Sequence, residues 1–151
     1  MLQNGLILTI KNNNSYNLNF TPISVVTLLN LKTMNLIEIF SIILIHWFAD
    51  FVLQTDKQAK GKSKNWSDLL GHTFTYSLIW LSMISWLGFW QGLIFVLITF
   101  IAHTITDYFT SRLNSKLWSE GKVHNFFVSV GFDQVLHYVQ LFITYYYLKN
   151  G

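Results

Sequence analysis

The chain has 151 residues, enough for about one domain, and 52% of them are hydrophobic and 17% aromatic while only 11% are charged. Because soluble domains carry about a quarter charged residues, this composition excludes an ordinary soluble domain and predicts an all-α integral membrane protein. The absence of cysteine excludes disulfides and thiolate metal ligands, and the formal charge of +3 comes from basic residues gathered mainly in two loops, so we expect no nucleic-acid partner.

Residues 1–33 form a polar, asparagine-rich segment without the basic start and long apolar run of a signal peptide. A second methionine, Met34, stands directly before the first long apolar stretch. We therefore expect residues 1–33 to be a dispensable tail and residues 34–151 to form the membrane domain.

Four apolar stretches follow, and each is close to the roughly 20 residues that a helix needs to cross a bilayer. They run from about Leu36 to Gln54, Leu69 to Trp86, Gly92 to Phe109 and Phe126 to Leu148. The connections Asp56–Asp68 and Ser111–Asn125 are polar, whereas Gly88–Gln91 is a short uncharged turn. This pattern predicts a four-helix bundle of transmembrane helices with up-down-up-down topology.

Basic residues in the first and third connections indicate the orientation of the bundle. The positive-inside rule puts both connections in the cytoplasm and both termini outside, as in a multi-pass protein of the cell inner membrane. Basic side chains near an anionic surface can also bind headgroups, so we expect membrane lipids as partners. The residues concerned are Lys57, Lys60, Lys62, Lys64, Arg112, Lys116 and Lys122.

Every predicted span contains a pair of polar residues spaced i, i+4, in the sequences HWFAD, HTFTY, HTITD and DQVLH. This spacing puts both side chains on one helix face. An Asp at the bilayer centre costs on the order of 2.5–3.5 kcal/mol, so such residues are expected to face the bundle interior. The pairs are His46 with Asp50, His72 with Tyr76, His103 with Asp107 and Asp133 with His137. Gln54 continues the first pair's face toward the lysine-rich loop.

The order and spacing of HWFADFVLQTD, the lysine-rich loop, HTFTY, HTITDYF and FDQVLH resemble a family of small bacterial and phage membrane proteins, domain of unknown function 3307. The resemblance covers nearly all of residues 34–148 and does not extend to the tail before Met34. It implies a small multi-spanning inner-membrane protein, and it implies no substrate or reaction.

Three interpretations of the polar layer remain open. Its side chains could hydrogen-bond across helices, relay protons or a cation, or bind a divalent metal ion such as zinc, iron or manganese. The candidate ligands are His46, Asp50, His72, His103, Asp107, Asp133 and His137. One or two of them would brace the ligands instead, and Tyr76 could act as an acid or as a hydrogen-bond donor. The corresponding functions are a membrane-embedded metal-dependent hydrolase and a non-enzymatic transporter, channel or assembly protein.

The predicted topology can be tested with single cysteines, because the chain has none of its own. Cysteines at Ser63 or Ser119 should react with an impermeant thiol reagent only from the cytoplasmic side, and a cysteine at Gly88 only from outside. Labelling of Ser63→Cys and Gly88→Cys from the same side would contradict four spans.

Overall fold

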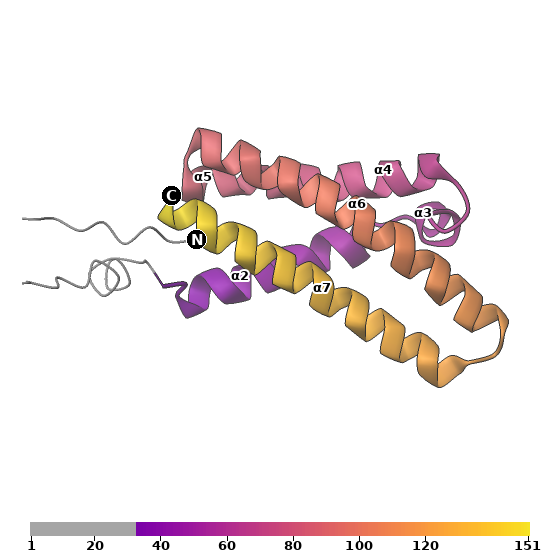
Figure 1. The fold of residues 1–151 in the computed structure, drawn as a ribbon. Helices are drawn as coiled ribbons and strands as arrows, with labels where there is room; N and C mark the ends of the chain where they lie inside the picture. Colours follow the sequence, from indigo (N-terminus) through magenta and orange to yellow (C-terminus); the bar gives the residue numbers. More distant parts are fainter. Residues whose placement is uncertain (1–32) are drawn as a thin grey trace, which may run out of the picture. The chain divides into compact units, whose positions relative to one another are not determined.

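The computed structural model describes residues 33–151, and every regular element in this range is a helix (Figure 1). The helical fold class predicted from the sequence is thus confirmed for this part of the chain. The predicted tail, residues 1–33, lies outside the described residues except for Thr33.

The first segment consists of α2 (Leu36–Trp47) and a π-helical turn, η1 (Phe48–Val52). Asn35 starts α2 with a capping box: its Oδ1 accepts a hydrogen bond from the Glu38 backbone N–H, and the Glu38 carboxylate accepts one from the Asn35 backbone N–H. The helical part of the first predicted span ends at Val52. It changes from α-helical to π-helical geometry at Phe48.

The second segment is interrupted. A short helix, α3 (Asp56–Gly61), occupies part of the connection that we expected to be only a polar loop, because Thr55 and Gln58 form a second capping box. Then follow α4 (Trp66–Ile79), a 3₁₀ turn η2 (Trp80–Met83) and α5 (Ile84–Leu87). Together α4, η2 and α5 cover the second predicted span.

The last two helices, α6 (Phe89–Ser119) and α7 (Val123–Asn150), are longer than the predicted spans. The connection expected at Ser111–Asn125 is mostly helical, because no glycine or proline interrupts the chain before Gly121, whose φ of +68° ends it. At the other end of α6, Gly92 allows close approach to α5, since a Cβ there would lie 2.6 Å from the Ile84 Cα.

Consecutive segments run in alternating directions, with α6 packed against α4, η2, α5 and α7, and with α2 beside α7 (Figure 1). An ion pair joins the start of α2 to the end of α7, because the Lys149 Nζ lies 2.7 Å from the Glu38 Oε1. The turn before α6 is thus at the same end as Glu38, and α3 lies at the opposite end near the α6–α7 turn.

The interior of the described part of the chain is rich in polar side chains. Among these residues, buried apolar side chains such as Ile42, Trp80 and Phe95 are outnumbered by buried His, Asp, Thr and Ser side chains, whereas large apolar residues are exposed on the outside of α2, α6 and α7. By length and composition, α6 and α7 could each cross a membrane. The first two predicted spans are divided at η1 and η2 and are not continuous helices of that length.

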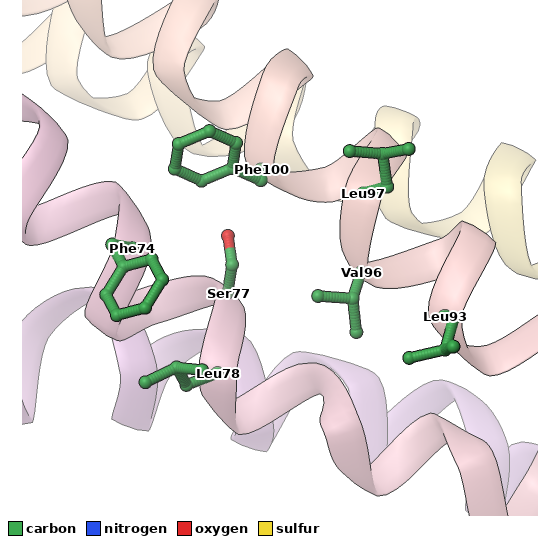
Figure 2. A pocket seen from close by; sticks show the side chains of 7 residues that line it. All are labelled: Phe74, Ser77, Leu78, Leu93, Val96, Leu97 and Phe100. Atoms are coloured by element: carbon green, nitrogen blue, oxygen red, sulfur yellow. The ribbon is translucent and has the colours of Figure 1, made fainter.

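An apolar groove of about 250 Å³ lies between α4 and α6 (Figure 2). Phe74, Leu97 and Phe100 are among its lining residues, and Ser77 contributes the one hydroxyl. Because this hydroxyl donates a hydrogen bond to the Thr73 carbonyl oxygen at 2.7 Å, the groove offers no uncommitted donor. It contains none of the residues that the sequence singled out as ligands.

Candidate metal centre

All seven candidate ligands are buried, and they come together from every long segment of the bundle. Potential ligand atoms within 4.8 Å of one another form three overlapping groups. The groups are Asp50, His72, His103 and Asp107; His46, Asp50 and His137; and Asp107, Asp133 and His137. We call these seven residues the His/Asp cluster.

The first group is the tightest and has the spacing of a four-coordinate metal site. The His72 Nε2 lies 3.0 Å from the Asp50 Oδ1, 3.4 Å from the Asp107 Oδ2 and 3.2 Å from the His103 Nε2. The His103 Nε2 lies 3.5 Å and 3.6 Å from the same two oxygens. Ligands of tetrahedral Zn²⁺, with bonds of about 2.0–2.2 Å, are separated by roughly 3.3–3.6 Å. Two imidazole nitrogens and two carboxylate oxygens thus lie within 4.8 Å of one another, close enough to hold one ion together.

The π-helical turn η1 carries Asp50 into this group. Its wider turn is closed by the Leu53 N–H, which donates to the Phe48 carbonyl oxygen five residues earlier at 3.1 Å. Asp50 therefore reaches His72 on α4, while its other oxygen, Oδ2, lies 3.9 Å from the His46 Nε2. Single-turn π-helices are frequent at functional sites, but nothing in the spacing of the apolar residues reveals this one.

Gln134, which the sequence analysis did not single out, links three members of the cluster. Its Nε2 lies 3.2 Å from the Asp50 Oδ2 and 3.0 Å from the Asp133 Oδ2, and its Oε1 lies 2.9 Å from the His46 Nε2. An ionised carboxylate only accepts hydrogen bonds, so the amide nitrogen must be the group that faces Asp50 and Asp133. The only sequence signal for this linking role is that Gln134 stands next to Asp133 in DQVLH.

This orientation fixes the tautomer of His46. Because the Gln134 Oε1 is an acceptor, the His46 Nε2 must carry the proton, and its Nδ1 then accepts a hydrogen bond from the Tyr76 hydroxyl at 2.8 Å. Both ring nitrogens of His46 are thus committed. Tyr76 and His46 thus hold the Gln134 amide in place, and the amide holds the carboxylates of Asp50 and Asp133. Residues behind metal ligands commonly have this role.

His137 and Asp133 lie at the edge of the cluster. The His137 Nε2 is 3.8 Å from the Asp107 Oδ1 and its Nδ1 is 3.7 Å from the Asp133 Oδ2. Both distances exceed a hydrogen bond, and neither His137 nitrogen nor the Asp133 Oδ1 has a hydrogen-bond partner among the described residues. These two side chains are buried polar groups that remain available to a ligand.

Lys62, which the sequence assigned to topology or lipid binding, contacts the cluster. Its side chain is 16% exposed and its Nζ lies 2.9 Å from the Asp107 Oδ2. Burial alone would lower the pKa of Lys62, but the negative charges of Asp107 and Asp50 and the hydrogen bond to Asp107 raise the pKa above its usual value. Lys57, Lys60 and Lys64 are exposed, as expected for loop lysines.

Gln54 is not a member of the cluster; it lines a cleft of about 640 Å³ that also borders Asp50, Asp133 and Gln134. The cleft opens between the α3–α4 connection and the adjoining ends of α6 and α7. Gln54 thus lines the cleft together with Lys60, Lys62 and Lys64 of the lysine-rich loop.

Fold and cluster together define a small helical-bundle protein with a buried, nitrogen- and oxygen-rich site. The family model described as "Protein of unknown function (DUF3307)" matches residues 38–150, and the chain belongs to this family. A search of curated proteins and a search of solved structures found no match.

The bracing role of Tyr76 can be tested by Tyr76→Phe. Loss of the hydroxyl leaves the buried His46 Nδ1 without a donor, so we expect the free energy of unfolding to fall by about 1–3 kcal/mol. Tyr138→Phe is a matched control, because its ring also lies against His46, at 4.7 Å between centroids, while its hydroxyl makes no hydrogen bond with the described residues. Equal unfolding curves for the two variants would contradict the assigned network.

Proposed function

We propose that the protein is a multi-pass inner-membrane protein that holds one divalent metal ion in the His/Asp cluster and acts as a membrane-embedded, metal-dependent hydrolase. The observation that carries the proposal is the spacing of the His72 Nε2, the His103 Nε2 and one oxygen each of Asp50 and Asp107. These four atoms are the proposed ligands.

A membrane environment is supported by the distribution of polarity. Ile101, Ile105 and Phe109 on α6 and Phe132 on α7 are each at least 50% exposed, whereas His103, Asp107 and His137 on the same helices are at most 1% exposed. A folded chain in water gains free energy by the opposite arrangement. In the proposed orientation α3 and the α6–α7 turn face the cytoplasm and both termini lie outside.

The balance of charge supports a single divalent ion. With neutral imidazoles, the carboxylates of Asp50, Asp107 and Asp133 carry three negative charges, and Lys62 supplies one positive charge. Two negative charges are left in a buried site, where uncompensated charge is costly. One M²⁺ ion neutralises the cluster.

The donor set suits zinc, iron or manganese, since it consists of imidazole nitrogens and carboxylate oxygens without thiolate. To act on a substrate, the ion would need a coordination position for water beyond the four proposed protein ligands; it would then lower the pKa of that water and polarise a substrate oxygen. Asp50 and Asp133 border both the cluster and the cleft, so a substrate in the cleft would lie next to the ion's ligands. Lys62 would hold Asp107 in place from the cleft side.

A proton or cation relay is the second candidate, and one observation favours it. Polar contacts continue beyond the cluster along α6 and α7, where the Gln140 Nε2 donates to the Thr99 Oγ1 at 3.3 Å and to the Thr144 Oγ1 at 3.1 Å. This chain extends toward the end of the bundle that holds Glu38 and Lys149. A transporter would need such a path, and a hydrolase would not.

Metal content distinguishes the two candidates. We expect the purified protein to carry about one divalent ion per chain by elemental mass spectrometry, and we expect His72→Ala and His103→Ala to lose it, because each removes one of four ligands. His124→Ala is the control, since His124 is exposed at the start of α7 and outside the cluster. A metal-free protein that conducts protons in liposomes would contradict the hydrolase and favour the relay.

A further inference from the structure

The cleft beside the His/Asp cluster is lined by two chemically different sets of side chains. Its volume is about 640 Å³, and the polar set consists of loop lysines and of serine, asparagine and glutamine side chains. The aromatic set includes Phe51, Trp118 and Phe127, which are 49%, 60% and 63% exposed. Asp50, Asp133 and Gln134 form its inner end at the His/Asp cluster.

Three of the polar side chains that line the cleft carry hydrogen-bonding groups without a partner among the described residues. The Gln54 Nε2, the Ser111 Oγ and the Asn114 Oδ1 are buried and have no hydrogen-bond partner among the described residues. Ser111 is only 8% exposed. Burying such groups without partners costs free energy, so three of them around one cleft point to a polar ligand that they bind.

The charge of the cleft selects an anion. Lys60 and Lys64 line it and form no ion pair with any described residue, in contrast to Lys62, which is paired with Asp107. Once one divalent ion has neutralised the cluster, these two lysines leave the cleft with two positive charges. A phosphate monoester carries about 1.5 to 2 negative charges at neutral pH, which matches them.

The aromatic residues of the lining favour an amphiphile. Trp118 lies near the end of α6 and Phe127 in the first turns of α7, at the end of the bundle proposed to face the cytoplasm. Aromatic residues at this depth contact the boundary between headgroups and acyl chains. A soluble phosphate would leave these exposed aromatic side chains without a partner.

We propose that the cleft binds a lipid whose headgroup carries a phosphate monoester. The phosphate lies between Lys60 and Lys64 and reaches toward the metal-binding cluster, while the acyl chain leaves along Phe51, Trp118 and Phe127. This proposal rests on the proposed function in two ways. The bound ion neutralises the inner end of the cleft, and lipids with a phosphate-monoester headgroup would be the substrate class of the proposed hydrolase.

The test measures retention of phosphatidic acid by the metal-loaded, full-length protein, using native mass spectrometry after reconstitution with mixtures of phosphatidic acid and phosphatidylcholine. We expect selective retention of phosphatidic acid. Because each basic residue near an anionic group contributes about fivefold in affinity, Lys60→Ala/Lys64→Ala should weaken binding by roughly 20- to 30-fold. Lys57→Ala/Lys116→Ala removes two exposed lysines outside the cleft lining and should retain the lipid.

Two further measurements show whether a negative result contradicts the lipid-binding proposal alone or the proposed function as well. Metal content should be unchanged in Lys60→Ala/Lys64→Ala, since neither lysine is a proposed ligand. Trp118→Ala should weaken retention of phosphatidic acid without changing binding of inorganic phosphate. Metal-loaded protein that retains both lipids equally would overturn this inference alone, and equal binding of phosphatidic acid and inorganic phosphate would identify a soluble ligand instead. Metal-free wild-type protein would overturn the proposed function.

Discussion

Three carboxylates buried in one place are the constraint on which the rest of the structure depends. Asp50, Asp107 and Asp133 are each at most 7% exposed, and an isolated buried carboxylate would be far too costly to keep ionised. The bundle surrounds them with nitrogen groups: the His72 Nε2 lies 3.0 Å from Asp50, the Lys62 Nζ lies 2.9 Å from Asp107, and the Gln134 Nε2 donates to both Asp50 and Asp133. The helix faces that point inward are therefore those whose side chains compensate the negative charge of the three carboxylates.

Several local features follow from the same constraint. The π-helical turn η1 directs Asp50 toward α4. Gly61 lets α3 pack closely against the start of α4, beside the lysine that contacts Asp107, because a Cβ there would meet the Asp68 side chain. The apolar residues that a soluble bundle would bury are displaced to the outer faces of α6 and α7. The polar interior and the apolar outer faces therefore both follow from burying the three carboxylates with the groups that compensate their charge.

Much of this arrangement could be predicted from the sequence. Helical periodicity placed His103 with Asp107 and Asp133 with His137 on inward faces, because i, i+4 spacing fixes a shared face in any α-helix. The helical fold class followed from the apolar stretches. Helix ends were predicted less well, since the extension of α6 to Ser119 depends on the absence of helix-breaking residues in a polar segment.

Other parts of the site depend on tertiary contacts that no local pattern encodes. Lys62 was indistinguishable from Lys60 and Lys64 in the sequence, and only in the folded chain, where it caps the end of α3, does its Nζ lie 2.9 Å from the Asp107 Oδ2. Gln134 acquires its role from His46, which is distant in the chain. The division of the candidate ligands into a close group of four, a brace at His46 and an edge pair at His137 and Asp133 likewise requires the packed helices.

The central claim is that one metal ion lies among His72, His103, Asp50 and Asp107. Crystals of the purified protein, measured at the absorption edge of whichever metal the protein carries, test it most directly. The account predicts one anomalous peak about 2.0–2.2 Å from both imidazole Nε2 atoms and from one oxygen of each carboxylate. A difference map without such a peak, in which Lys62 and His72 alone satisfy Asp107 and Asp50, would contradict it.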